Sequence, residues 1–329
     1  MGRFRKERDT GCDERHAQAL SRGASPKSPS ETPPPAPGAP VRPAPASPPK
    51  DDLRAIESLR PPSGRHADDR PDSVPGREVY EHDGNKYRLN SPQTDILRAV
   101  GAFRTVRATD ILDGVYRGDE RAFERDLKQL QAQNLLTVSK FRGRPQVRFL
   151  SLTPEAKRLA DARLKHVSNQ RIYSGMAKLQ ELDHDAGLYR MYLKAIEGIE
   201  KNGGKPTRVV LDYELKKSIN RDLDAAKKLP EDEELAALQK LADQHDLKVV
   251  DGKIPVPDVR VEYETRDGEH AHLDLEYVTG NYRAEAIAEK ARAGFSLYAP
   301  AGFDRSSGGS AGRRVRDEYP SLAAEIIAL

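Results

Sequence analysis

The sequence predicts a mixed α/β protein with an N-terminal winged helix-turn-helix and a disordered, proline-rich N-terminal tail. Three observations lead to this fold class. Prolines are concentrated near the N-terminus, three amphipathic helical segments precede a basic hairpin, and the second half mixes strand-like and helical segments.

Composition narrows the class of protein. Charged residues make up 33% of the 329 residues and hydrophobic residues 36%, with no apolar run long enough to span a membrane. No apolar stretch follows the basic N-terminus, so a secretory signal peptide is not expected. Cys12 is the only cysteine, which excludes an internal disulfide and zinc sites built from paired cysteines. We expect a cytoplasmic protein.

The proline-rich tail is expected to cover residues 1–76. Residues 1–75 hold 15 of the 24 prolines and show no apolar periodicity. Such a segment buries too little apolar surface to offset the entropy lost on ordering. We therefore expect a disordered tether with polyproline II character.

A winged helix-turn-helix is predicted over residues 77–168. A short hairpin should turn at Asp83-Gly84, and helices are expected over 90–103, 108–116, 118–134 and 153–164. Their predicted N-terminal capping residues are Asn90 or Ser91, Asp119 and Thr153.

Basic side chains identify this segment as a candidate DNA-binding domain. Residues 90–165 hold 15 Lys and Arg against 9 Asp and Glu, whereas residues 166–329 carry a net charge of −5. A helix fits the major groove, and cations beside it neutralise phosphates. The candidate DNA-binding residues, on the third helix and the following hairpin, are Arg121, Arg125, Lys128, Lys140, Arg142, Arg144 and Arg148. The alternative is a solvated or protein-binding surface.

The second half predicts an α/β domain over residues 169–300, followed by a mobile basic loop and a C-terminal helix over 301–329. Its expected elements are a helix from 183 to 204, a strand over 207–215, two charged helices over 216–245, a strand over 247–250, a hairpin over 256–277 and a helix over 282–298.

The hairpin has one register that collects its apolar residues on one face. Val259 then faces Leu275, and Val261 faces Leu273. The other face carries carboxylates at the end away from the turn: Asp258, Asp274 and Glu276. Clustered carboxylates repel each other unless a cation joins them, so Asp258 and Asp274 are candidate ligands of Mg²⁺. In the alternative, Arg260 pairs with Asp274 across the strands and the face is merely solvated.

Pro257-Asp258, the hairpin and Asp274–Glu276 resemble the PD-(D/E)xK nuclease arrangement. The resemblance implies that two acids bind Mg²⁺ while a lysine activates water. Glu276 occupies the usual lysine position here, so Lys290 or Arg283 would have to reach in from the following helix.

Residues 90–300 also resemble the replication-relaxation family of bacterial mobile elements. The shared features are a winged helix, His184-Asp185 at a helix start, a Pro-Asp strand and the segment "LDLEYVTG". The resemblance implies a plasmid or integrative-element protein that acts in replication control, relaxation or transfer. Its partners would be double-stranded DNA and replication or conjugation proteins.

Three functions remain open. The first is a DNA-binding protein with a degenerate, non-cutting nuclease-like domain. The second is an active Mg²⁺-dependent endonuclease that uses Asp258, Asp274, Glu276 and Lys290. The third is a winged-helix transcription repressor whose second domain forms an oligomer.

Overall fold

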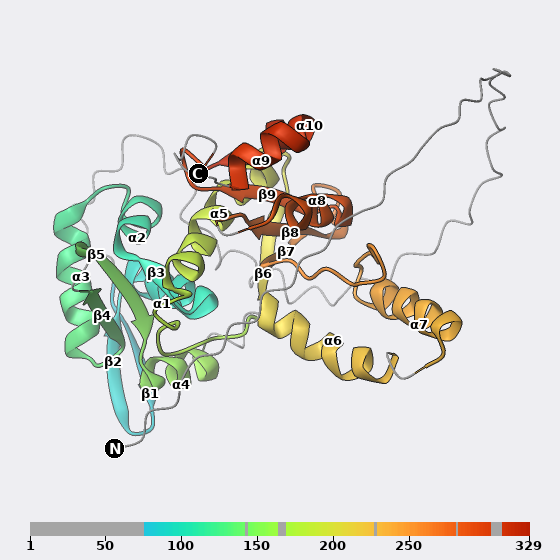
Figure 1. Ribbon diagram of the computed structural model, residues 1–329. Helices are drawn as coiled ribbons and strands as arrows, with labels where there is room; N and C mark the ends of the chain where they lie inside the picture. Colours follow the sequence, from blue (N-terminus) through green and yellow to red (C-terminus); the bar gives the residue numbers. More distant parts are fainter. Residues whose placement is uncertain (1–75, 142–143, 164–168, 227–228, 281, 304–310) are drawn as a thin grey trace, which may run out of the picture. The chain divides into compact units, whose positions relative to one another are not determined.

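The computed structural model describes residues 76–141, 144–163, 169–226, 229–280, 282–303 and 311–329, which form a mixed α/β structure (Figure 1). All of these residues belong to the same unit of the chain. Within these ranges, no helix has the length and apolar character needed to cross a membrane. Residues 1–75 of the predicted tail and Arg142 lie outside the described residues.

The N-terminal elements follow the predicted order of hairpin, three helices, hairpin and helix, with a short strand, β3, that was not predicted between the first two helices. Their bounds are β1 Glu78–His82, β2 Asn85–Leu89, α1 Ser91–Phe103, β3 Val106–Arg107, α2 Ala108–Gly114, α3 Glu120–Ala132, β4 Leu136–Phe141, β5 Arg144–Leu152 and α4 Pro154–Arg163. β5 lies between β3 and β4 in a three-stranded sheet. The predicted caps are confirmed, because the side chains of Asn90, Asp119 and Thr153 each accept a hydrogen bond from a backbone N–H of the first helical turn.

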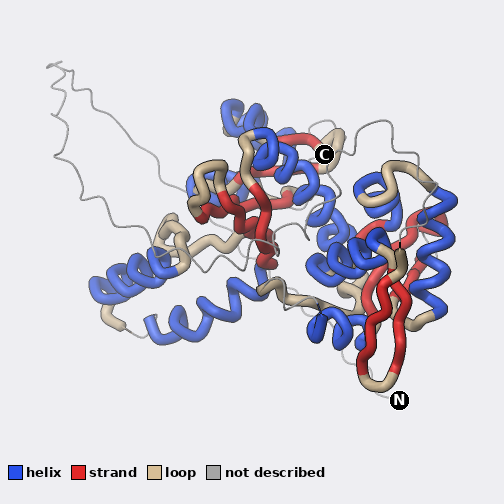
Figure 2. The backbone as a smooth tube through the Cα atoms, turned by 180° about the vertical axis from the view of Figure 1, so that it is seen from behind, coloured by secondary structure: helices blue, strands red, loops and turns tan. Residues whose placement is uncertain are grey.

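The C-terminal elements are built around a five-stranded sheet with the order β10-β9-β8-β7-β6. Their bounds are α5 Leu182–Lys201, β6 Lys205–Leu211, α6 Asp212–Ala226, α7 Glu231–Gln244, β7 Val259–Glu264, β8 His270–Tyr277, α8 Ala284–Ala293, β9 Ser296–Ala299, α9 Ala311–Glu318, α10 Pro320–Glu325 and β10 Ile327–Ala328. β6, β7 and β8 are antiparallel, whereas β9 runs parallel to both β8 and β10. Figure 2 shows α6 and α7 as two consecutive helices beside the sheet.

The sheet buries both of its faces. Val259, Val261 and Leu275 belong to the same core as α1 and α5. Val210 and Leu297 belong to a second core with residues of α6, α7, α8 and α9. Alternate side chains of a strand point to opposite faces, so the apolar residues of β6 to β9 are divided between these two cores.

The predicted hairpin register is confirmed. Val259 pairs with Leu275, Val261 with Leu273, and Arg260 with Asp274. Beyond the strands, Thr265 N donates to Glu269 O, which closes the predicted turn. Gly268 adopts a φ of 82°, which any other residue type would rarely adopt.

Four expected elements differ. The strand expected over 247–250 is only an isolated bridge between Val250 and Lys253. The strand expected over 207–215 spans 205–211, and α6 begins at Asp212. The helix expected over 282–298 ends at Ala293, because Gly294 has a φ of 94° and caps it, after which β9 begins. Within the expected basic loop, residues 311–318 are helical, while 304–310 lie outside the described residues.

Helix α5 approaches β8 closely at Gly187. A Cβ atom at this position would lie 2.5 Å from Cε1 of the Tyr277 ring. The Tyr277 ring also lies edge-on to His184, with ring centroids 5.7 Å apart. The missing side chain of Gly187 therefore allows β8 to pack directly on the helix.

We predict that Gly187→Ala destabilises the protein by about 1–3 kcal/mol, because Tyr277 must move. Gly198→Ala is the matched control in the same helix, where an added Cβ meets no atom within 4 Å. Because alanine has the higher helix propensity, this control should stabilise the protein by up to about 1 kcal/mol. Denaturant unfolding measures both changes, and equal effects of the two substitutions would contradict the close packing.

Candidate functional site

Two carboxylates meet where β7 begins and β8 ends. Asp258 directly precedes β7, and Glu276 is the penultimate residue of β8. The backbone N–H of Asp258 donates to Glu276 Oε2 at 3.2 Å, so the two residues are direct neighbours. Asp258 is 9% exposed and Glu276 is fully buried. Two acids in such a site need cations or protons nearby.

Glu276 is held by a lysine and a tyrosine. Lys290 Nζ, from α8, lies 3.0 Å from Glu276 Oε1 and donates to Val256 O at 2.7 Å. Tyr282 OH donates to the same Oε1 at 2.9 Å. Burial is the largest influence on Glu276 and, with the negative charge of Asp258, raises its pKa to about 7. The ammonium of Lys290 and the Tyr282 hydroxyl act against this rise.

Asp258 is held by a histidine and a backbone amide. His184 Nε2 lies 3.1 Å from Asp258 Oδ2, and Tyr277 N donates to the same oxygen at 2.9 Å. The other ring nitrogen of His184, Nδ1, lies 3.5 Å from Asp185 Oδ1. Burial lowers the pKa of His184, but hydrogen bonds and negative charge from Asp185 and Asp258 outweigh it and raise the value to about 10. His184 is therefore an imidazolium at neutral pH.

Asp274 does not join this pair, so the predicted three-carboxylate cluster is corrected. Arg260 donates from Nε to Asp274 Oδ1 at 2.7 Å and from Nη2 to Oδ2 at 2.8 Å. The same guanidinium also donates to the backbone carbonyls of His245 and Asp246. The cross-strand ion pair considered in the sequence analysis is thus the arrangement found.

The residues at this site do not fit Mg²⁺ as they stand. A divalent cation takes several oxygen ligands, but both oxygens of Asp274 face Arg260, and Oε1 of Glu276 faces Lys290 and Tyr282. No group of three or more His, Cys, Asp or Glu residues in the described ranges is arranged to hold a metal ion. The charges of this site are balanced by the chain's own cations.

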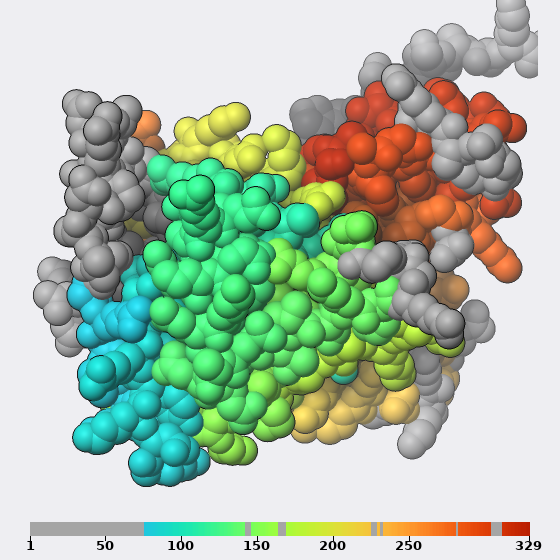
Figure 3. Space-filling view, turned by 90° about the vertical axis from the view of Figure 1, so that its left-hand side faces the viewer, coloured from blue at the N-terminus to red at the C-terminus, as the bar shows by residue number. Residues whose placement is uncertain are grey.

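The second candidate surface is the basic side of α3. Arg121, Arg125, Lys128 and the β4 residue Lys140 are exposed, while Phe123, Leu127 and Leu130 are buried on the opposite side of the helix. Arg148 is less available, because it pairs with Glu124 and its guanidinium lies over the Phe123 ring. Arg142 lies outside the described residues, and the structure describes only the backbone of Arg144. Figure 3 views the molecule from the side on which α3 (green) lies.

A buried carboxylate fixes the orientation of α3. Asp126 is 1% exposed and accepts hydrogen bonds from Asn90 Nδ2 at 3.2 Å and Tyr116 OH at 3.0 Å. Arg125, the next residue along the chain, donates to its other oxygen at 3.1 Å. These contacts tie α3 to the start of α1 and to the loop after α2. They fix the orientation of α3 about its own axis, so that its basic side faces solvent.

We call Asp258, Glu276 and the side chains that contact them the acid site. The sequence identifies only part of it. Asp258, Glu276 and Lys290 are among the residues that the sequence predicts for this site. His184 stands in the sequence analysis only as part of the His184-Asp185 motif, and no sequence pattern indicates Tyr282. His184 and Asp258 are 74 positions apart, so no local spacing relates them. The sequence predicts that Lys290 lies on the helix after the hairpin, but no pattern in it shows that this side chain contacts Glu276.

The acid site combines the two carboxylates of Asp258 and Glu276 with an ammonium, an imidazolium and a phenol, each within hydrogen-bond reach of one of the carboxylates. Such a set can hold protons at defined atoms and can present a cation to an anionic ligand. Comparison with known proteins found no matching family model, no similar curated protein and no similar solved structure.

We predict that the charge of His184 contributes stability that depends on pH. His184→Gln keeps a donor for Asp258 but removes the charge, which should cost about 1.5–3 kcal/mol at pH 7. The raised pKa means that this contribution is complete below pH 6.5 and is lost as the pH rises through about 10. Unfolding free energies of both proteins from pH 6 to 10.5 test this, and a constant difference would show that His184 acts without its charge.

Proposed function

We propose that this chain is a duplex-DNA-binding protein whose N-terminal elements, α1 to β5, act as a winged helix-turn-helix. The observation that carries the proposal is the basic side of α3, where Arg121, Arg125 and Lys128 are exposed on a helix anchored from beneath. An α-helix is narrow enough to enter the major groove, and cations on its outer side neutralise phosphates.

The β4–β5 hairpin would be the wing. Lys140 is exposed on β4 and would contact the DNA backbone beside the groove that α3 enters. Arg142 and Arg144 are proposed as further phosphate contacts on sequence grounds. Arg148 has a different proposed role, because its pairing with Glu124 and its position over Phe123 join the wing to α3.

The C-terminal sheet is proposed to be a nuclease-like domain that does not cut DNA. Its acid pair is neutralised by Lys290 and His184, and its third acid is neutralised by Arg260. The resemblance to the replication-relaxation family supports a cytoplasmic role in the replication, relaxation or transfer of a mobile element. In that role the domain would help to assemble a complex of DNA with replication or conjugation proteins.

An active nuclease is the second candidate, and the position of Lys290 favours it. The PD-(D/E)xK arrangement requires a lysine beside the acids, and Lys290 Nζ lies 3.0 Å from Glu276 Oε1. In this candidate, a helix would supply the lysine that the strand lacks. Against this candidate, Asp274 is fully engaged by Arg260, which leaves Asp258 and Glu276 as the available acids.

We predict that the chain binds duplex DNA with strong salt dependence, and that Arg121→Gln with Lys128→Gln weakens binding. Each lost phosphate contact should reduce the slope of log affinity against log salt by about 0.9, or about 1.8 for the pair. Fluorescence anisotropy of a labelled 20-base-pair duplex at several salt concentrations measures this slope.

The matched control is Lys217→Gln with Lys240→Gln, which removes two exposed lysines from α6 and α7. This control should leave the slope unchanged. Equal losses in the two double variants would mean that net charge, not the α3 surface, governs binding. An unchanged slope in the α3 variant would contradict the proposed function.

A further inference from the structure

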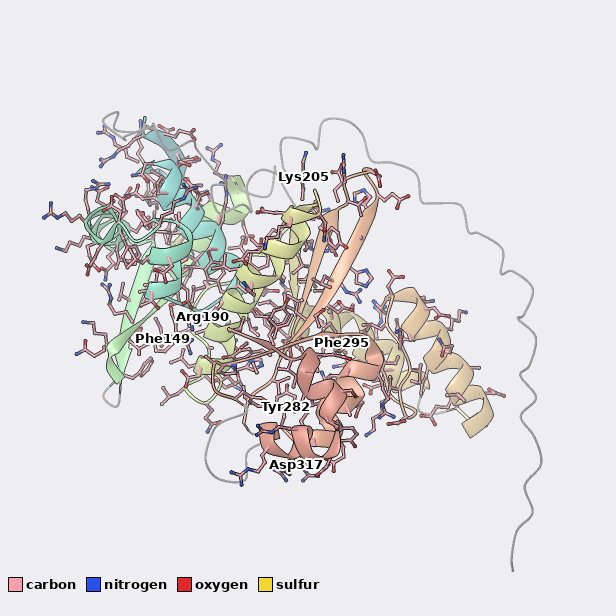
Figure 4. All side chains as sticks on the ribbon, turned by 90° about the horizontal axis from the view of Figure 1, so that it is seen from above. Phe149, Arg190, Lys205, Tyr282, Phe295 and Asp317 are labelled. Carbon is pink, nitrogen blue, oxygen red and sulfur yellow. The ribbon has the colours of Figure 1, made fainter. Side chains whose placement is uncertain are left out.

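A basic groove lies at the other end of the β7–β8 hairpin from the acid site. It has a volume of about 550 Å³, within the range of ligand-binding sites. The groove is lined by the C-terminal half of α5, the start of the hairpin turn and the C-terminal strand. Lys205, at the start of β6, pairs with Glu264 next to this turn. Figure 4 shows Lys205 at the opposite end of the sheet from Tyr282, which belongs to the acid site.

Cations from two separate elements line this groove. Lys194 and Lys201 come from α5, and Arg266 comes from the hairpin turn. One carboxylate, Glu197, also lines it and pairs with Lys194 at 2.8 Å. Lys201 and Arg266 are both exposed, and the groove as a whole has an excess of positive charge.

The Arg266 side chain rests on a glycine. Its Cβ, Cγ and Cδ atoms all lie 3.3–3.4 Å from where a Cβ of Gly203 would be, so the arginine stem passes over bare backbone. Gly203 has a φ of 78°, a conformation that favours glycine and ends α5 at this point. The helix end and the hairpin turn are thereby held together, which brings Lys201 and Arg266 to one rim.

Apolar and aromatic side chains form the floor. Tyr263 is half-buried, Tyr298 is 4% exposed, and Ile199 and Leu273 complete the surface between them. Tyr263 is the aromatic ring most open to the groove. Cations on the rim above an aromatic floor match the needs of a nucleic-acid strand, whose phosphates are anionic and whose unpaired bases stack on aromatic rings.

We propose that this groove binds a segment of single-stranded nucleic acid, with Lys201 and Arg266 on phosphates and Tyr263 beneath a base. A duplex keeps its bases stacked inside, so it cannot use the aromatic floor. The site is distinct from α3 and independent of the duplex-binding function. In a protein that also binds duplex DNA, it would hold a strand that has been separated from its partner.

The test uses the full chain and a labelled twelve-nucleotide oligothymidylate. Lys201→Gln with Arg266→Gln should weaken its binding at least fivefold and reduce the salt slope by about 1.4, at about 0.7 per phosphate contact on a single strand. The same variant should bind the duplex as the wild type does. The α3 variant should show the reverse pattern, so failure of this proposal is distinguishable from failure of duplex binding.

Stacking is tested with two substitutions at Tyr263. Tyr263→Phe should keep the affinity within about twofold, whereas Tyr263→Leu, which retains an apolar floor, should weaken binding about fivefold or more. Equal affinities of the leucine and phenylalanine variants would overturn the stacking role. Unchanged oligothymidylate binding in Lys201→Gln with Arg266→Gln would overturn the site. Displacement of the labelled oligothymidylate by polyglutamate at a lower concentration than unlabelled oligothymidylate requires would also overturn it, because it would indicate an acidic-peptide groove.

Discussion

The packing of α5 is the constraint on which the rest of the structure depends. Phe103 of α1 contacts Tyr189 and Tyr192 of α5, with ring centroids 5.3 and 5.1 Å apart. The same helix packs on β8 at Gly187 and supplies His184 to the acid site. Arg190, further along it, donates to the buried Asp110 of α2. One rigid helix thus positions the N-terminal helices, the acid site and one wall of the basic groove.

Pairs of opposite charges recur among the buried carboxylates. Asp274 has Arg260, Glu276 has Lys290, Asp258 has His184, and Asp110 has Arg190. Arg260 and Asp274 are buried on both sides of their pair, so removing one of them would leave an uncompensated charge and cost about 3–5 kcal/mol, whereas the intact pair adds little net stability. The cations therefore fix where the carboxylates lie, and they leave few free oxygens for a metal ion. This internal balance is the physical basis for proposing a non-cutting nuclease-like domain.

The sequence predicted those parts of the fold that local chemistry determines. The hairpin register follows from the alternation of Val259 and Val261, and the capped starts of α1 and α3 follow from Asn90 and Asp119. Glycine at position 294 ended a helix that was predicted to continue, because the left-handed cap overrode the periodicity. The partners of Asp258 and Glu276 lie on α5 and α8, and such contacts depend on tertiary packing that single-sequence patterns do not contain.

We propose that the chain binds DNA but does not cut it, because its acid site is neutralised internally. Supercoiled plasmid DNA, incubated with the full chain and millimolar Mg²⁺ or Mn²⁺, tests this most directly when retardation and nicking are followed on one gel. The expected result is retardation with no more relaxed DNA than in the buffer control. Metal-dependent nicking that is lost in Asp258→Asn would contradict it and establish the nuclease instead.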